Sequence, residues 1–164
     1  MSSLNGPRQA ILVTSSAEVK VMGIQKEKDN IITLAWHMPV SHNPNLYAIA
    51  LGKQRFSTGI IQKSKCFAVN FMPAELEKEI LLCGRKSGIS SDKFKLCSFR
   101  KVECTTIECP RIKEAIGYLE CELVQEIEAG DHIIFIGKVL KSELSEDKKR
   151  LFHIKDDIFT TTKR

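Results

Sequence analysis

Four cationic and hydroxyl-bearing side chains occur within six residues of the chain, at Lys53, Arg55, Ser57 and Thr58. A phosphate monoester carries close to two negative charges and is bound by charged donors, hydroxyls and the free N–H groups at the start of a helix. The hydrophobic spacing predicts a short helix over residues 57–65, which Ser57 or Thr58 could cap. A solvated basic turn followed by a capped helix would show the same pattern, so both interpretations remain open.

The segment before this group could accept a flat apolar ring. Thr33, Ala35, Trp36 and His37 end a strand-like run and lead into a loop bounded by prolines. Ala35 is small enough to let a ring approach the backbone, whose amides could bond to ring nitrogen and oxygen atoms. A tryptophan in this place is more often part of the core. The order of the two segments nevertheless suggests a flavin mononucleotide (FMN) site on a small β-barrel.

The elements that must position these residues are mainly strands. A hairpin turn is predicted at the charged residues 26–30, with a strand break at Ser15–Ser16, and a second turn at residues 128–131. A helix is predicted over residues 73–83, with Gly84 closing it. Many strands and few helices predict an all-β barrel. The predicted strands cover residues 10–14, 18–24, 31–36, 46–51, 66–71, 116–127 and 132–144.

The composition is that of an ordinary globular domain, with 43% hydrophobic and 27% charged residues. No repeat or linker divides the 164 residues, so one domain is predicted over residues 1–164. The net charge of +5 comes from scattered side chains, which argues against nucleic-acid binding but suits a small anionic cofactor. There is no apolar run of roughly 18 residues and no signal-peptide pattern at the N-terminus, so we predict a cytoplasmic protein without membrane contact.

The cysteines and histidines do not form a pattern typical of a metal site. None of the six cysteines belongs to a C-x-x-C pair, so we predict buried free thiols and no structural zinc. The spacing of the four histidines matches no known ligand set. No metal is therefore predicted.

Six short motifs in a fixed order resemble the flavin reductase-like family, which has an FMN-binding split barrel and includes flavoredoxins and short archaeal ferric reductases. The resemblance covers residues 11–144. It implies a six-stranded Greek-key split β-barrel with a few short helices, FMN as cofactor, and a homodimer with the flavin near the subunit interface. The motifs are T-L-A-W-H-M-P-V-S at 33–41, P-N-L-Y-A-I-A-L at 44–51, R-F-S-T-G-I-I at 55–61, F-A-V-N at 67–70, G-I-S-S-D-K-F at 88–94 and A-G-D-H-I-I-F-I-G at 129–137.

The resemblance also implies roles for individual residues. It places the ring against residues 33–37 and the phosphate at the turn around Arg55 and Ser57, with Lys53 as a further contact. It brings His132 to the side of the flavin that receives a nicotinamide, where the imidazole would align the reactants. The family pattern adds four cofactor-binding candidates: Asn70, Ser87, Lys93 and Phe94. The loop that contains the last three could equally be a solvated excursion.

These residues predict a flavoprotein oxidoreductase that takes a hydride from NADH or NADPH. Its electrons would pass to free flavin, ferric iron or a protein acceptor. One alternative is an FMN electron carrier without nicotinamide activity, and a second is a barrel that has lost its cofactor. After the last barrel strand, many relatives carry an aromatic or histidine segment followed by paired glycines. This chain has L-F-H at 151–153 and then K-D-D at 155–157, so it lacks the glycines. The sequence therefore leaves open whether this tail reaches the site.

Overall fold

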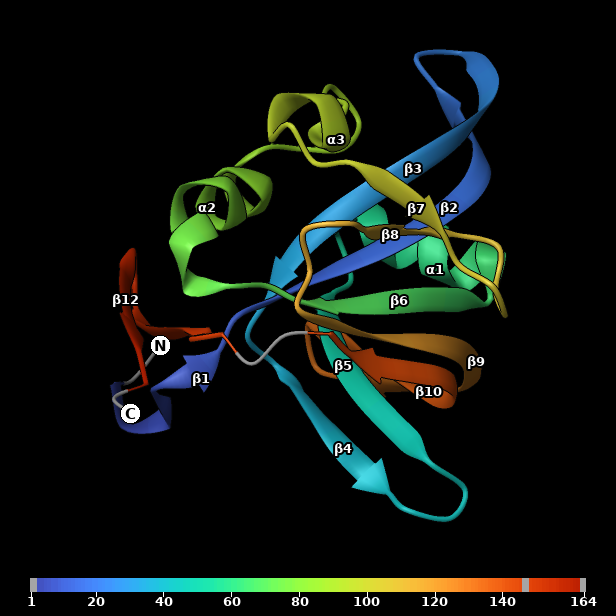
Figure 1. The fold of residues 1–164 in the computed structure, drawn as a ribbon. Helices are drawn as coiled ribbons and strands as arrows, with labels where there is room; N and C mark the ends of the chain where they lie inside the picture. Colours follow the sequence, from blue (N-terminus) through green and yellow to red (C-terminus); the bar gives the residue numbers. More distant parts are fainter. Residues whose placement is uncertain (1–2, 146–147, 163–164) are drawn as a thin grey trace.

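The computed structural model describes residues 3–145 and 148–162, which form mainly β-strands with a few short helices (Figure 1). The predicted all-β split barrel is confirmed. Residues 1–2 and 163–164, the ends of the predicted domain and part of the segment searched for a signal peptide, lie outside the described residues.

The main sheet contains seven antiparallel strands in the order β3-β2-β6-β9-β10-β5-β4. The chain leaves β5 near one edge and returns through α1 to β6 in the middle of the sheet. Within this sheet the edge strands β3 and β4 have one neighbour each, so the barrel stays open. The strands are β2 (Ile11–Val21), β3 (Ile24–Leu34), β4 (His37–Ser41), β5 (Leu46–Gly52), β6 (Cys66–Phe71), β9 (Gly117–Ala129) and β10 (His132–Leu144).

Two small sheets and the helices flank the main sheet. The helices α2 and α3 lie side by side against β3, and α1 packs on β2 (Figure 1). None of the described helices is long and apolar enough to cross a membrane. The small sheets are β1 (Arg8–Gln9) with β11 (Leu151–Lys155) and β12 (Ile158–Thr161), and β7 (Lys101–Glu103) with β8 (Pro110–Ile112); the helices are η1 (Ser3–Asn5), α1 (Phe56–Ser64), η2 (Ala74–Leu76), α2 (Glu77–Arg85) and α3 (Lys93–Leu96).

The first half of strand β2 is buried on both faces and separates two hydrophobic clusters. Side chains alternate across a strand, so Ile11 and Val13 point into the barrel while Leu12 points to the other side. The barrel cluster contains Phe67 and Phe135 among others. The second cluster lies under α2 and α3, so these helices and the segment between them are anchored to β3 by apolar packing.

The predicted break at Ser15–Ser16 and the predicted turn at residues 26–30 are wrong. The strands β2 and β3 are continuous and pair along their whole length, from Ile11 with Leu34 to Val21 with Ile24. The turn lies at Met22–Gly23, where both residues have positive φ angles, 51° and 83°. Such angles are those of a two-residue hairpin turn. The outer half of this hairpin is largely exposed, so its charged side chains do not interrupt the strands.

Two further boundaries differ from the prediction. The expected proline-bounded loop contains β4, which pairs with β5 and gives the main sheet its seventh strand; Pro39 is tolerated there because β4 is an edge strand. The predicted helix over residues 73–83 is a short η2 followed by α2, which continues through Gly84. A Cβ atom at Gly84 would come within 3.3 Å of the Thr33 side chain, so this glycine permits helix–strand contact instead of ending the helix.

Candidate functional site

A cavity of about 640 Å³ lies where the end of β3 meets the turn between β5 and α1. The segment after α2, the start of β10 and the tail at β11 complete its wall. The pairing of His132 with Gly52 brings the start of β10 beside the turn that leads into α1. The predicted site residues that line the cavity are Thr33, Ala35, Trp36, Arg55, Ser57, Ser87, Lys93 and His132.

Aromatic rings form one part of the wall. Trp36 and His132 are stacked with their ring centroids 4.7 Å apart, and the Arg8 guanidinium lies 5.9 Å from the Trp36 ring. The His132 Nδ1 atom is 2.7 Å from a carboxylate oxygen of Asp131, and this contact lowers the pKa of that exposed carboxyl. The imidazole is therefore held by a ring on one side and a carboxylate on another. Ala35, a small residue next to Trp36, also lines the cavity.

The start of α1 forms another part of the wall. Arg55 is the N-cap residue, and no side chain caps the helix. The prediction that Ser57 or Thr58 caps it is wrong, because Ser57 Oγ accepts a hydrogen bond from Asn30 Nδ2 at 2.7 Å and Thr58 Oγ1 donates to the Gly52 carbonyl at 2.9 Å. The first N–H groups of a helix have no partner within the helix. This start of α1, with the Arg55 side chain beside it, can therefore receive an anion.

Lys93 is a buried cation in the cavity wall. Lys93 is only 5% exposed, and its Nζ atom donates to the carbonyls of Ile31 and Cys83, both at 2.7 Å. No carboxylate of the described residues pairs with it. Burial lowers the pKa of Lys93, and the nearby Arg55 charge acts in the same direction, whereas the Cys83 thiol acts to raise it. A buried ammonium without a counter-charge is costly, and an anion in the cavity would offset that cost.

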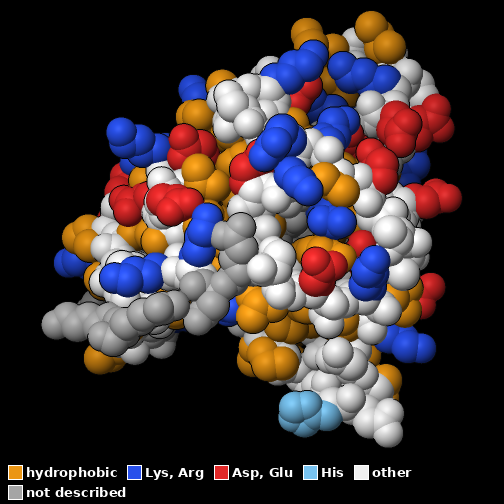
Figure 2. All heavy atoms as spheres, viewed as in Figure 1, with side chains coloured by type: hydrophobic (Ala, Val, Ile, Leu, Met, Phe, Trp, Pro, Cys, Tyr) orange, Lys and Arg blue, Asp and Glu red, His pale blue; other side chains and the backbone are white. Residues whose placement is uncertain are grey.

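The remaining charges of the wall are also mostly positive. On the face drawn in Figure 2, basic side chains are interspersed with acidic and uncharged ones. Within the described cavity wall, by contrast, Asp156 is the acidic residue among several basic ones. The basic residues of the wall are Arg8, Arg55, Arg85, Lys86, Lys93 and Lys155.

Two parts of the wall are not indicated by the sequence. Asn30 belongs to the predicted turn at residues 26–30, but it is 2% exposed, bonds to Ser57, and has a buried Oδ1 atom without a protein partner. The tail also reaches the cavity, since residues 153–156 line it. The tail is placed there by the pairing of β11 with β1, in which His153 is opposite Arg8. No local signal in the tail shows this pairing, because it depends on a strand at the other end of the chain.

Three predicted cofactor-binding residues, on β4, in the turn after β5 and on α1, lie outside the cavity wall. His37 is held between Tyr47 Oη, 2.7 Å from Nδ1, and the Gln9 carbonyl, 2.8 Å from Nε2, and burial lowers its pKa despite the Gln9 contact. Lys53 forms an exposed ion pair with Glu128 at 2.7 Å. Thr58 Oγ1 donates to the Gly52 carbonyl. These three side chains therefore have protein partners that account for their positions.

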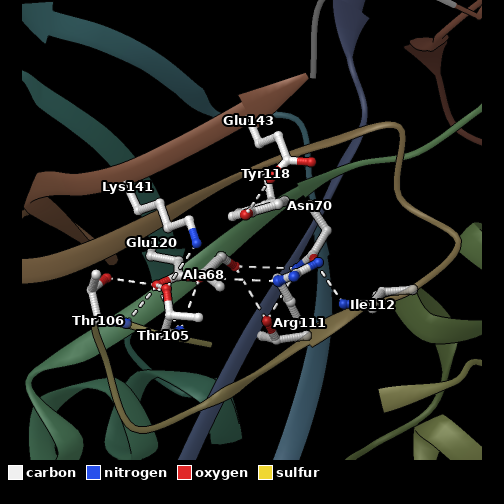
Figure 3. Close-up of polar contacts among 11 residues, drawn as sticks. Ala68, Asn70, Thr105, Thr106, Arg111, Ile112, Tyr118, Glu120, Lys141 and Glu143 are labelled. Carbon is white, nitrogen blue, oxygen red and sulfur yellow. Dashed lines mark hydrogen bonds and ion pairs between the residues drawn. The ribbon is translucent and has the colours of Figure 1, made fainter. Parts of the chain in front are cut away.

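Asn70 and Phe94 also lie elsewhere. Asn70 is fully buried and donates to the Leu12 carbonyl at 3.2 Å. Its side-chain oxygen accepts from the Ile112 N–H at 2.8 Å (Figure 3). It therefore connects β2, β6 and β8. Phe94 belongs to the second hydrophobic cluster and is 4% exposed. Among the described residues, no group of three His, Cys, Asp or Glu side chains is arranged to hold a metal ion.

A second polar group surrounds Glu120 on β9 and is separate from the cavity (Figure 3). The buried carboxylate accepts hydrogen bonds from the N–H groups of Thr105 and Thr106 at 3.0 and 2.8 Å and from Thr106 Oγ1 at 2.6 Å. Arg111 Nε lies 4.0 Å away. Burial acts to raise the pKa of Glu120, but the hydrogen bonds from Thr106 and Thr105 outweigh it, so the pKa is lowered. This group fastens the loop between β7 and β8 to the barrel.

The fold is that of a split barrel, and its cavity combines an aromatic wall with a basic, uncapped helix start. The chain belongs to the flavin reductase-like family, since residues 4–162 match the model of the flavin reductase like domain. The resemblance found in the sequence is thereby confirmed.

Individual relatives and solved structures agree with this assignment. An uncharacterized protein of Archaeoglobus fulgidus is 36% identical over 114 residues, and a flavin reductase of Pseudomonas putida is 30% identical over 115 residues; each match covers 70% of this chain and 64% of the relative. An FMN-binding protein from Thermus thermophilus has the same fold, with a TM-score of 0.85 at 21% identity, covering 98% of this chain and 89% of that one. The family and these relatives support a flavin-related role in oxidation–reduction or electron transfer.

Proposed function

We propose that the cavity binds FMN, with the phosphate at the start of α1 and the ring system beside Ala35, Trp36 and His132. The observation that carries this proposal is that one cavity combines an aromatic wall with an uncapped helix start flanked by Arg55. The buried charge of Lys93 adds a second cation that an anionic ligand would neutralise. The T. thermophilus protein, which is described as FMN-binding, supports the choice of cofactor.

The cavity fits FMN in volume and in chemistry. Its volume of about 640 Å³ falls within the range of roughly 300–1,000 Å³ that is usual for ligand pockets. Asn30 Oδ1 is a buried acceptor without a protein donor, and a ribityl hydroxyl could supply the missing hydrogen bond. Ser57 Oγ lies next to it and can share in the same network. The wall thus offers cations for the phosphate and neutral polar atoms for the sugar chain.

We infer that the protein is an NAD(P)H-dependent flavin or ferric reductase. Bound FMN would supply the two-electron chemistry, accepting a hydride from NADH or NADPH. The protein would hold the ring, exclude water and align the nicotinamide, with His132 as a positioning residue because Trp36 and Asp131 fix its imidazole. The acceptor would be free flavin, ferric iron or a protein. A cytoplasmic homodimer with the flavin near the interface remains part of this proposal.

Two measurements test the proposed function. The purified protein should bind FMN, seen as visible flavin absorbance or as quenching of FMN fluorescence on titration. A colourless protein that does not take up added FMN would contradict flavin binding. The holoprotein should then lose its flavin absorbance rapidly when it is mixed without oxygen with NADH or NADPH in a stopped-flow instrument. If the flavin stays oxidised with both nucleotides but accepts electrons from a chemical reductant, the protein is an FMN electron carrier.

A further inference from the structure

Two cysteines in the second hydrophobic cluster lie unusually close to each other. The sulfur atoms of Cys83, on α2, and Cys97, which follows α3, are 3.2 Å apart, and either thiol can donate to the other. A disulfide bond is about 2.05 Å long, so the two atoms would have to approach by only about 1 Å. The sequence gives no sign of this pair, because the two residues lie 14 positions apart and form no C-x-x-C motif.

Other contacts show that the thiols are held together by the fold. Both residues are buried, at 0% and 5% exposure, and both pack in the cluster under α2 and α3. Cys97 Sγ has one further contact, to the Glu79 carbonyl at 3.6 Å. The Cys83 carbonyl accepts a hydrogen bond from Lys93 at 2.7 Å, so α2 is tied to α3 next to the thiols. Their approach therefore comes from packing of two helices and not from a flexible loop.

We propose that Cys83 and Cys97 form a disulfide when the protein meets hydrogen peroxide. Cys97 is the more exposed residue of the two. Its sulfur attacks one peroxide oxygen, the O–O bond breaks, and a sulfenic acid and water result. The Cys83 sulfur then attacks the sulfenic sulfur, the S–S bond forms, and a second water leaves. The two thiols lose two electrons and two protons, and the peroxide is reduced to two waters. Because burial raises the pKa of both thiols, little thiolate is present and the oxidation should take minutes to hours.

The disulfide would fix one wall of the cavity. The segment between the two cysteines contains Gly84 through Ile89 and also Lys93, all of which line the cavity. In the reduced protein this segment is held by hydrogen bonds and by the exposed ion pair of Arg85 with Asp157. The disulfide would close this segment into a covalent loop and restrict its motion. Less conformational entropy would then be lost when a ligand binds. The expected tighter binding of flavin rests on the proposed function, whereas the formation of the disulfide does not.

Peptide mapping tests the bond itself. The full-length protein is treated with dithiothreitol or with hydrogen peroxide, its free thiols are alkylated under denaturing conditions, and it is digested with trypsin without reduction. Oxidation should produce a cross-linked pair of the peptides E-I-L-L-C-G-R (79–85) and L-C-S-F-R (96–100), and the whole protein should carry two fewer alkyl groups. Six alkylated cysteines after oxidation, or a cross-link between other cysteines only, would overturn the proposal.

Variants test what the bond does. The oxidised protein should melt roughly 5–10 °C above the reduced one, and this difference should be absent in Cys97→Ser and kept in the control Cys66→Ser. If Cys97→Ser does not fold, the peptide map of the unmodified protein still decides the first step. FMN titrations of both forms, done anaerobically, should give a smaller dissociation constant for the oxidised form. Equal constants would refute the coupling, and no binding by either form would refute the proposed function while leaving the mapped bond intact.

Discussion

Lys93 provides a sharp test of the proposed anion site. Its Nζ atom is held by two carbonyls at 2.7 Å and has no carboxylate partner among the described residues. Lys93→Met keeps an unbranched side chain and removes the charge. If the ammonium interacts with bound FMN, the variant should lose a charge-assisted interaction of about 1.5–3 kcal/mol. That loss corresponds to a dissociation constant raised roughly 10- to 150-fold.

The stability of the protein without ligand should respond much less. The substitution leaves the carbonyls of Ile31 and Cys83 without this donor, which costs about 1–3 kcal/mol for each buried group. It also removes a buried ammonium without a counter-charge, whose burial costs several kcal/mol. The two effects have opposite signs and similar sizes. We therefore expect the free energy of unfolding of the ligand-free variant to stay within about 2 kcal/mol of the unmodified protein.

FMN fluorescence titration and urea unfolding measure the two quantities separately. The matched control is Lys95→Met on the same helix, because the Lys95 side chain is 88% exposed and pairs only loosely with Asp92 at 3.9 Å. It does not line the cavity and should leave both quantities unchanged. An unchanged dissociation constant in Lys93→Met, together with a loss of more than about 3 kcal/mol in stability, would show that Lys93 is only structural.

The pH dependence of Lys93 gives the same test a second readout. Burial lowers its pKa below the ordinary lysine value of 10.5. Between the folded and unfolded pKa values the unfolded chain binds more protons, so this residue makes stability rise with pH in that window. As the pH rises towards 10.5, the unfolding free energy of the unmodified protein should therefore increase relative to that of Lys93→Met. Over the same pH range, the tighter FMN binding of the unmodified protein relative to the variant should diminish.

Three further substitutions test other parts of the structure. Arg55→Ala should weaken FMN at least about tenfold more than riboflavin in titrations, since riboflavin lacks the phosphate, and equal losses would show that Arg55 is not the anchor. Gly137→Ala should lower stability to urea by about 1–3 kcal/mol, because the new Cβ would lie 2.7 Å from Phe67 and 2.8 Å from Cys121; an unchanged midpoint would contradict this packing. Glu120→Gln should cost about 1–3 kcal/mol at neutral pH, and the loss should shrink as the pH falls through the range in which the carboxylate is protonated.

The sequence predicts the elements of this fold wherever the local pattern and the tertiary structure agree. The buried strands β5 and β6, the helix between them, and the turn that joins β9 to β10 are confirmed close to their predicted bounds. Two of the errors concern polar residues that the local pattern assigns to a break or a turn, at Ser15–Ser16 and at residues 26–30. The hairpin of β2 and β3 extends away from the core, so its outer part does not need alternating apolar residues. Its polar sequence is therefore typical of a loop. Its true turn depends on the positive φ angle of Met22, which no propensity indicates.

The family pattern predicts some of the residues that line the cavity, but it also includes residues that do not line it. Trp36, Arg55 and Lys93 line the cavity, whereas Asn70 and Phe94 are buried in the interior, although they too belong to family motifs. The difference lies in side-chain direction. Lys93 and Phe94 are neighbours on α3, yet Lys93 lines the cavity and Phe94 packs in the second hydrophobic cluster. Short motifs do not resolve such directions.

The tail shows how a residue far along the chain enters the site through backbone pairing. Leu151 is 2% exposed, and its carbonyl accepts a hydrogen bond from the Ala10 N–H at 2.8 Å. The exposed ion pair of Arg85 with Asp157 also joins the tail to α2, but such pairs contribute at most about 1 kcal/mol. The position of the tail therefore depends on the pairing of β11 with β1. This pairing is made by backbone groups of residues 152–153, so the tail lines the cavity although the paired glycines of many relatives are replaced here.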